Sequence, residues 1–245
     1  MIFYNFSGGM ESAAMLVLER ERILAGNCCV SFADTQKQFP EQYDSIKQIN
    51  RQLGINIVVL PPRITFDEFL FERGGMIRKG TNDCSRRMKR AVLMAHMKTF
   101  TKPYEVNLGF NADEGQRADD FVKLNERDWC HWRFPLIERG IDRDATWEIC
   151  RKAGFEILIG MYEKMGRFDC FWCGNQTRKQ AQKVAKYYPE LAAEWMAAEE
   201  RKGHSFMPMP LKMLLDDGPL FASTGCSCFG GTESVFEDEP NCAAR

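Results

Sequence analysis

The sequence predicts a doubly wound α/β fold with a mostly parallel sheet, and three observations support this prediction. Strand-like and helix-like segments alternate from residue 2 to residue 152. Segment 41–53 has apolar residues at helical spacing, whereas segment 55–60 is a continuous apolar run that ends at two prolines. A hydrophobic content of 44% over 245 residues is sufficient for a real core. This alternation is typical of βαβ units, so we expect the functional site at the carboxyl ends of parallel strands.

The individual elements follow from local composition. Strands are predicted from β-forming runs at 2–6, 27–33, 55–60, 104–110 and 132–137. Helices are predicted at 11–22, 41–53, 86–98 and 144–152. Residues 175–202 are predicted to be helical as a two-helix cover, followed by a short linker and helix at 207–215. Gly54 and Gly154 are placed to end two of these helices. From residue 233 the chain is acidic and contains proline, and we expect this tail to be poorly ordered.

Charge and hydrophobicity limit the class of protein. The formal net charge is −1, so the chain as a whole is not attracted to nucleic acid or to a membrane surface. No apolar run is long enough to span a bilayer. Met1 leads directly into the first predicted strand, without the pattern of a signal peptide. We therefore expect a cytoplasmic protein with no membrane partner.

Ten cysteines are many for a reducing compartment, where disulfides are rare. Clustered cysteines in such a chain more often bind metal or carry out redox chemistry. Cys28, Cys29 and Cys150 lie in apolar strand and helix patterns, and we interpret them as core residues. Cys130 and Cys242 are interpreted as lying outside any functional site.

The first predicted strand is followed by a glycine turn and then by a helix. Ser7, Gly8 and Gly9 break the strand, and the helix begins near Glu11. Backbone N–H groups at a helix N-terminus lack internal partners and attract anions, and glycines let a phosphate approach them closely. This segment is not a Walker A loop, because no Gly-Lys-Ser/Thr follows it. A phosphate-binding loop is one interpretation, and a purely structural βα turn is the other.

Two further segments carry polar or charged side chains where strands end. Asp34 and Thr35 directly follow the second strand, although a plain helix cap would look the same. Segment 73–90 carries seven positive charges and one negative charge. It is either a solvated face or a basic loop over a phosphate-bearing substrate. Cys84, in this segment, precedes a helix that begins with Arg86, which predicts a lowered thiol pKa.

The strand at 104–110 is followed by a polar loop that ends at Arg117. Arginine offers two parallel donors to a phosphate, so Arg117 is a candidate phosphate clamp. The alternative is a surface arginine that pairs with Asp113 or Asp119.

Cys170 and Cys173 have the C-x-x-C spacing that places two thiolates on one metal ion or cluster. Zinc, an iron–sulfur cluster and a redox disulfide all use this spacing. Four sulfur ligands are needed for a tetrahedral site, and the candidates for the other two are Cys84, Cys226 and Cys228. The alternative is a pair of buried thiols in an aromatic core.

Taken in order, these segments resemble the motifs of the adenine nucleotide α-hydrolase superfamily. This group of PP-loop, or N-type ATP pyrophosphatase, proteins includes tRNA thiolases and phosphoadenylyl-sulfate (PAPS) reductases. Residues 7–12 are similar to the family's Ser-Gly-Gly-x-Asp-Ser loop, with Glu11 in place of Asp. Residues 32–41 are similar to the Asp-Thr-Gly-x-x-Phe-Pro-Glu segment, with Gln36 in place of Gly.

The resemblance spans roughly residues 1–180 and includes two more elements. One is the family's Arg-x-Cys-(Cys/Thr)-x-x-x-Lys element, and the other is its Gly-x-Arg-x-x-Glu-Ser-x-Arg loop. The matching residues are Cys84 and Lys89 in the first and Gly109, Glu114 and Arg117 in the second, where Asn111 replaces the first Arg.

The resemblance implies that the chain binds ATP or PAPS together with Mg²⁺. The implied nucleotide-binding residues are Ser7, Gly8, Gly9, Met10, Glu11, Ser12, Asp34, Thr35, Gly109, Glu114 and Arg117, and the implied catalytic residues are Glu11, Lys89 and Arg117. Relatives among DNA phosphorothioation and thiolation proteins imply a 4Fe-4S cluster, or alternatively zinc. The implied ligands are Cys84, Cys170, Cys173 and Cys226, with Cys228 as the alternative fourth ligand. The implied regions are a nucleotide-binding domain (1–165), a cysteine-bearing helical region (166–232) and the tail (233–245).

Three functions are compatible with this resemblance. The first is adenylation or thiolation of a nucleic acid or a small molecule, with a cysteine desulfurase as the partner that donates sulfur. The second is reduction of PAPS or adenylyl-sulfate, which in this family uses a cysteine followed by Gly and His near the C-terminus. None of Cys226, Cys228 and Cys242 is followed by His, which favours the first function. The third is a nucleotide- and cluster-binding accessory subunit. Assembly into an oligomer is compatible with each of them.

Overall fold

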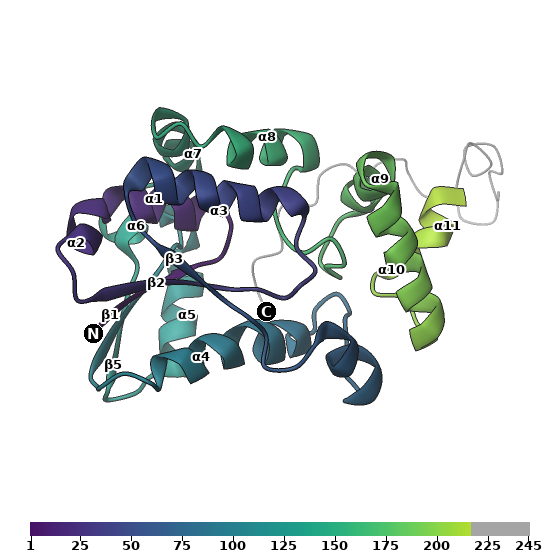
Figure 1. The fold of residues 1–245 in the computed structure, drawn as a ribbon, viewed down its shortest axis with the longest axis horizontal. Helices are drawn as coiled ribbons and strands as arrows, with labels where there is room; N and C mark the ends of the chain where they lie inside the picture. Colours follow the sequence, from purple (N-terminus) through teal and green to yellow (C-terminus); the bar gives the residue numbers. More distant parts are fainter. Residues whose placement is uncertain (217–245) are drawn as a thin grey trace, which may run out of the picture.

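The computed structural model describes residues 1–216 and has a five-stranded sheet at its centre (Figure 1). The strands are β1 (Ile2–Phe6), β2 (Cys28–Ala33), β3 (Ile57–Leu60), β4 (Tyr104–Leu108) and β5 (Cys130–Arg133). Their order is β3-β2-β1-β4-β5, and every neighbouring pair is parallel. The predicted doubly wound parallel fold is therefore confirmed. The strand order reverses between β1 and β4, which is where ligands bind in open α/β sheets.

Helices cover both faces of the sheet (Figure 1). One layer contains α1 (Met10–Leu18), α2 (Arg20–Leu24), α3 (Pro40–Leu53), α7 (Arg143–Lys152) and α8 (Glu156–Met165). The opposite layer contains the π-helix η2 (Ser85–Arg90), α4 (Ala91–Met97) and α5 (Gly115–Asn125). Three shorter elements join these layers to the strands, namely η1 (Glu68–Glu72), the 3₁₀ turn η3 (Ala112–Glu114) and α6 (Pro135–Glu138).

Side chains of β1 alternate between the two cores. Tyr4 and Phe6 are buried in the larger core, beneath the layer that contains α1 and α3. Phe3 points to the other face and is fully buried against Met97 of α4 and Tyr104 of β4. A strand with period-two burial on both faces is the usual central strand of such a sheet. The residues that follow β1 are therefore held by packing on both sides.

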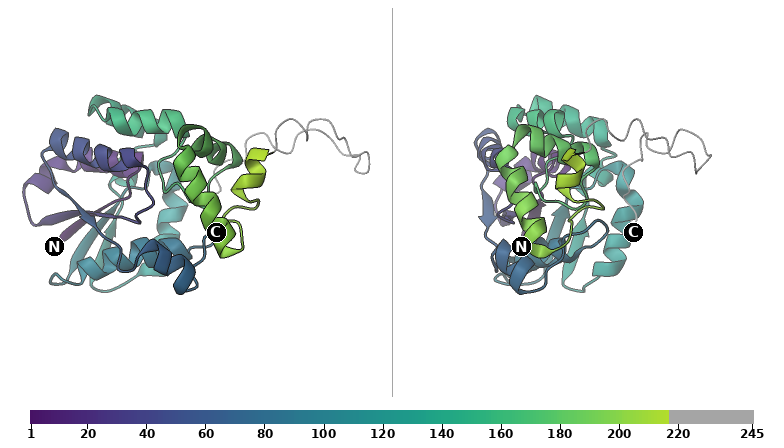
Figure 2. Two further views of the ribbon diagram at one scale, coloured as in Figure 1. Left: turned by 45° about the vertical axis from the view of Figure 1, so that its right-hand side comes forward. Right: turned by 90° about the vertical axis from the view of Figure 1, so that its right-hand side faces the viewer.

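The last three described helices form a group at one end of the sheet (Figures 1 and 2). They are α9 (Arg178–Tyr187), α10 (Pro189–Lys202) and α11 (Leu211–Asp216). Residues 175–202, predicted to be helical as a two-helix cover, form two helices that are divided at Tyr188, which has φ −142° and ψ 64°. A residue before proline disfavours the α conformation, and Pro189 follows. Tyr188 instead contacts Phe39, with ring centroids 4.9 Å apart, and so joins this group to the α/β core.

Two other predicted boundaries also differ from the structure. The strand predicted over 132–137 is wrong beyond Arg133, because Pro135 begins helix α6. Proline lacks an amide hydrogen and is favoured at the first position of a helix. The helix predicted over 11–22 is interrupted at Glu19, which has φ −95° and ψ 6°.

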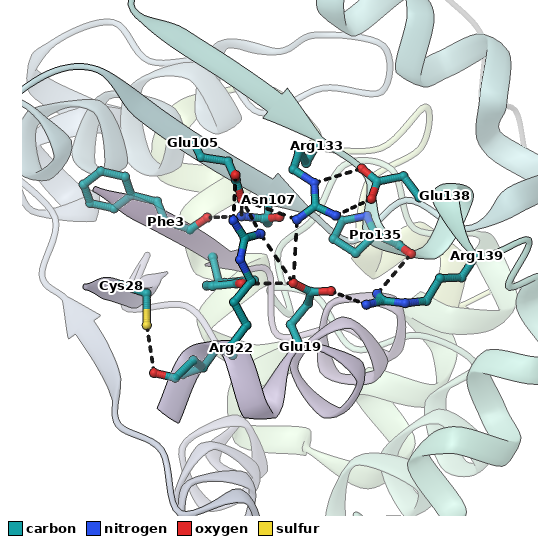
Figure 3. Close-up of polar contacts among 12 residues, drawn as sticks. Phe3, Glu19, Arg22, Cys28, Glu105, Asn107, Arg133, Pro135, Glu138 and Arg139 are labelled. Atoms are coloured by element: carbon teal, nitrogen blue, oxygen red, sulfur yellow. Dashed lines mark hydrogen bonds and ion pairs between the residues drawn. The ribbon is translucent and has the colours of Figure 1, made fainter. Parts of the chain in front are cut away.

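Glu19 belongs to a charged network that ties the end of α1 to β4 and β5 (Figure 3). Its side chain is only 2% exposed and pairs with Arg139 at 2.6 Å, Arg22 at 3.7 Å and Arg133 at 3.8 Å. Glu105 of β4 pairs with Arg22 at 2.6 Å and with Arg133 at 3.5 Å. A buried carboxylate needs such partners, because an unpaired charge in the interior is costly. The network fixes α1, whose opposite end carries the predicted phosphate loop.

Within residues 1–216, no helix is both long enough and apolar enough to cross a membrane. Cys226, Cys228, Cys242 and the acidic tail lie outside the described residues. The expectations for them, and the proposed division at residues 165 and 232, stay predictions.

Candidate functional site

Loop 7–12 forms a tight turn between β1 and α1. Gly8 has φ +89°, and a Cβ atom there would lie 2.6 Å from the side-chain oxygen of Gln42. Gly109, just after β4, approaches the same turn so closely that its Cβ would lie 2.6 Å from the Cα of Ser12. Both positions therefore require glycine. The structure brings the expected residue Gly109 directly against the loop, at the point where the strand order reverses.

The loop amides are held by oxygens of the protein. The amide of Ser7 donates to the Ser12 hydroxyl at 3.1 Å, and the amide of Gly9 donates to the Ser7 hydroxyl at 3.3 Å. The amide of Met10 donates to the Tyr162 hydroxyl at 3.1 Å. The amides of Gly9 and Met10 lie at the N-terminus of α1, where the helix dipole is positive. The loop can bind an anion when the hydroxyl oxygens move away from these amides, or when an amide donates to a hydroxyl oxygen and to the anion at the same time.

Glu11 lies in the first turn of α1 and is enclosed by surrounding groups. Burial raises the pKa of its carboxyl group, and this effect exceeds the lowering that the hydrogen bond from its own backbone N–H causes. Glu114 raises this pKa further, whereas Arg143 and Arg117 lower it. Positive and negative groups from three other segments therefore meet beside the loop.

Asp34 and Thr35 follow β2 and take different roles. Asp34 accepts hydrogen bonds from the backbone of Gln36 at 2.7 Å and from the Tyr43 hydroxyl at 3.0 Å. Thr35 is fully buried, and its hydroxyl lies 3.0 Å from the sulfur of Cys170. The segment after β2 therefore connects the nucleotide side of the predicted site to the cysteine side.

Arg117 is engaged by its own neighbours. Its guanidinium pairs with Glu114 and lies over the ring of Phe110, 4.4 Å from the ring centroid. Asn111 begins the turn with a capping box in which Glu114 accepts from the Asn111 backbone. The ion-pair partner is thus Glu114, and not Asp113 or Asp119 as the alternative interpretation had it. Arg117 also lies within electrostatic reach of Glu11.

Three of the predicted cysteine ligands converge on Lys89. Cys170 is buried, Cys84 and Cys173 are half-buried, and all three lie within electrostatic reach of the Lys89 ammonium. The neighbouring Cys170 sulfur is the main reason why the pKa of Lys89 is raised. The prediction of a lowered pKa for Cys84 is wrong. Burial, with Cys170 nearby, raises that pKa to about 12, because desolvation outweighs the positive charge of Lys89.

A metal site is not formed in the described part of the chain. Within residues 1–216, no three or more His, Cys, Asp or Glu side chains are arranged to hold a metal ion. The three thiols nevertheless fit a zinc ion or iron–sulfur cluster in kind, since both are held by cysteine thiolates. Cys84 directly precedes η2, and Cys170 and Cys173 lie in the turn before α9, where the aromatic rings of Phe171 and Trp172 are buried. The candidate fourth ligands, Cys226 and Cys228, lie outside the described residues.

A cavity of about 290 Å³ opens beside loop 7–12. It lies between the ends of β1, β2 and β4 and the helices η2, α4 and α5, and its polar rim includes Ser7 and Lys89. The apolar lining includes Phe32, Met97, Leu108, Trp129 and Trp132. A concave, mostly apolar pocket with a few polar groups is typical of a small-molecule site.

Sequence reasoning missed three features of this region. The lining of the cavity comes from seven separate helices and strands, so no contiguous motif marks it. Tyr162 lies outside the motifs of the loop, about 150 residues further along the chain, yet its hydroxyl contacts the Met10 amide. Arg143 was not singled out, yet it lies within electrostatic reach of Glu11 and Tyr162. Arg143 is the first residue of α7, and this position indicates a place near Glu11 only when the packing of α7 on α1 is known.

Comparison with known proteins assigns the chain to a class. Residues 1–128 match the family model of the phosphoadenosine phosphosulfate reductase domain. The protein therefore belongs to this PAPS reductase-like family, as the motifs predicted. The matched region contains loop 7–12, Asp34, Cys84, Lys89 and Arg117.

Individual relatives are more distant. The uncharacterized protein MJ0973 of Methanocaldococcus jannaschii is 24% identical over 211 residues, which cover 82% of this chain and 48% of that protein. The chain thus spans about half the length of this curated relative. A PAPS reductase from Candida auris, solved as a phosphate complex, is similar over 62% of this chain and 72% of that one, with 14% identity and a TM-score of 0.46. The U34-tRNA thiolase NcsA from Methanococcus maripaludis, solved with its [4Fe-4S] cluster, is similar over 83% and 72%, with 12% identity and a TM-score of 0.44.

Proposed function

We propose that the protein binds ATP at loop 7–12 and uses it to adenylate an acceptor that is then thiolated. The observation that carries this proposal is the position of Lys89. Its side chain lines the cavity beside Ser7 and also lies within electrostatic reach of Cys84 and Cys170. The Lys89 ammonium therefore lies between the proposed nucleotide site and the cysteines proposed for the sulfur chemistry.

The nucleotide would be divided between two parts of the site. The aromatic and apolar walls of the cavity suit a planar base, because stacking on such rings is favourable for any base. The amides of residues 8–10 and the positive end of α1 suit the phosphates. Glu11 is the carboxylate available to Mg²⁺, which prefers oxygen ligands together with substrate phosphates. Membership of the PAPS reductase-like family supports the same placement.

In the proposed reaction, an oxygen of the acceptor attacks the α-phosphorus of ATP. A new phosphorus–oxygen bond forms, the bond to the bridging oxygen breaks, and pyrophosphate leaves. Hydrosulfide, released from the persulfide of a cysteine desulfurase by a thiol reductant that supplies two electrons, then displaces AMP and leaves a thiolated acceptor. Lys89 would stabilise negative charge that develops near the α-phosphate, which is worth most in an enclosed site. An iron–sulfur cluster on Cys84, Cys170 and Cys173 would supply a place to hold the sulfur atom.

A second candidate is reduction of PAPS, and the observation that favours it is the family model itself, which is named for that reaction. Reduction requires a thiolate that attacks the sulfur of the sulfonyl group. Within residues 1–216, burial raises the pKa of Cys84 to about 12 and that of Cys150 likewise, so neither is a ready nucleophile. This chemistry and the absence of His after the tail cysteines support thiolation as the first choice.

The test uses the full-length protein, purified without oxygen. With ATP and Mg²⁺ we expect release of pyrophosphate, and with PAPS and thioredoxin we expect no sulfite. Lys89→Gln should lower pyrophosphate release about a hundredfold, since removal of one stabilising group costs on this order. Lys123→Gln is the matched control, because Lys123 is exposed on α5. Sulfite release would establish the reductase instead, and ATP binding without either product would indicate an accessory subunit.

A further inference from the structure

Helix α8 delivers one side chain to loop 7–12 from about 150 residues further along the chain. The Tyr162 hydroxyl oxygen accepts a hydrogen bond from the Met10 amide at 3.1 Å. A Cβ atom on Gly9 would lie 3.0 Å from the same oxygen. The hydroxyl therefore sits against the two residues at which the turn becomes helix α1. This is where an anion attracted by the helix would be expected.

The phenol ring is fixed in this position. Trp147 of α7 contacts it edge to face, with ring centroids 5.9 Å apart. Helix α8 also packs on both α3 and α7, so the hydroxyl cannot move far from the loop. A fixed polar group at a binding site loses little conformational entropy when the ligand arrives.

The hydroxyl retains a proton to donate. The Met10 amide uses one lone pair of the oxygen, and within residues 1–216 no acceptor for the hydroxyl proton is found. Burial is the main cause that raises the pKa of Tyr162, and the nearby Glu11 carboxylate raises it further. The group is therefore a neutral O–H donor at neutral pH.

We propose that the Tyr162 hydroxyl is part of the phosphate site at loop 7–12. The hydroxyl donates a hydrogen bond to an oxygen of the bound pyrophosphate group. This inference rests on the proposed nucleotide site and adds a donor from a helix that no loop motif contains. A hydrogen bond from a fixed donor to a charged phosphate is stronger than one between neutral groups. The arrangement also makes α8, which leads directly to the Cys170 turn, part of the nucleotide site.

The test is calorimetric titration of the full-length protein with three probes, namely pyrophosphate, ATP and adenosine. In Tyr162→Phe we expect the affinity for pyrophosphate and ATP to fall about tenfold, which is the loss of one charged hydrogen bond. The affinity for adenosine should be unchanged, since the cavity is lined without Tyr162. A merely structural defect would lower all three affinities together.

Tyr104→Phe is the matched control, because its hydroxyl donates to the Phe100 carbonyl at 2.9 Å in the smaller core. It should leave all three affinities unchanged. Equal or tighter pyrophosphate binding by Tyr162→Phe would overturn the inference, and so would a wild-type protein that binds neither pyrophosphate nor ATP. Pyrophosphate binding that weakens as expected, in a protein that releases no pyrophosphate from ATP, would support Tyr162 and reject the proposed reaction.

Discussion

Gln36 adopts a backbone conformation that favours glycine. Its φ is +64°, and the related family segment has glycine at this position. The Gln36 side chain is exposed, and the local turn is held by its backbone amide on Asp34. Gln36→Gly should therefore stabilise the protein by about 0.5 to 1 kcal/mol, because relief of left-handed strain exceeds the added entropy of the unfolded chain. Urea unfolding at equilibrium measures this change.

Asn27 provides the control for this prediction. It also has a positive φ, of 56°, but asparagine tolerates the left-handed region far better than glutamine. Asn27→Gly should accordingly change the free energy of unfolding less than Gln36→Gly. A destabilised Gln36→Gly variant would show that the side chain makes a contribution that its exposure does not reveal.

At the scale of single residues, sequence reasoning succeeded where a position is constrained by its immediate neighbours. Gly8 and Gly109 were identified from motifs, and both prove sterically obligatory. It failed where the environment comes from distant segments. The pKa of Cys84 was expected to fall because of adjacent arginines, but burial among residues far along the chain raises it. Tyr162 could not be assigned to the loop without the packing of α8.

Among the elements, β4 is held to α1 and β5 by the network around Glu105. Partial burial would by itself raise the pKa of Glu105, but hydrogen bonds from Arg22 and Asn107 outweigh it and lower the pKa to about 2. A carboxyl group with a lowered pKa in the folded state stabilises the protein above its unfolded pKa, near 4.5. This contribution is lost as the pH falls from about 4.5 to about 2.

We therefore predict a specific pH dependence for Glu105→Gln. At pH 7 the variant should be less stable than the wild type by about 1 to 2 kcal/mol, after allowance for screening by solvent. The difference should disappear as the pH approaches 2. Denaturant unfolding at a series of pH values measures it, with Glu72→Gln, an exposed carboxylate outside the network, as the control. A difference that does not change with pH would contradict the account.

Element boundaries show what periodicity can and cannot predict. The alternation of strands and helices, and the parallel sheet, followed from hydrophobic spacing alone. The helix that begins at Pro135 and the position of the break at Tyr188 did not, because apolar residues continue through both positions. In each case the conformational restriction of a single proline decides the boundary. The charged network of Glu19 was also not predictable, since the three arginines that pair with Glu19 lie in three different segments.

In the whole molecule, three cysteines from distant segments converge beside the nucleotide cavity. If they hold an iron–sulfur cluster, Cys170→Ser should abolish most of the bound iron and the broad visible absorbance, and should lower solubility. Iron and sulfide quantification of anaerobically purified protein measures this. Cys28→Ser is the control, because Cys28 is half-buried in β2 and its sulfur donates to the Ile23 carbonyl at 3.0 Å. Full iron content in Cys170→Ser would remove Cys170 from the ligand set.

The order of motifs was enough to predict the family and the fold. The structure brings Cys84 near Cys170 and Cys173, and the predicted ligand set stays a prediction. The shape of the site was not predictable in this way. The cavity is formed where η2, α4 and α5 meet the strand ends, so its volume and lining depend on packing between elements. The acceptor, the sulfur donor and the fourth ligand stay predictions.

A crystal structure of the protein with a non-hydrolysable ATP analogue tests the central claim most directly. We predict phosphate oxygens on the amides of residues 8–10 and the adenine ring in the cavity beside Leu108 and Trp132. A nucleotide bound elsewhere, with no phosphate oxygen at loop 7–12, would contradict it.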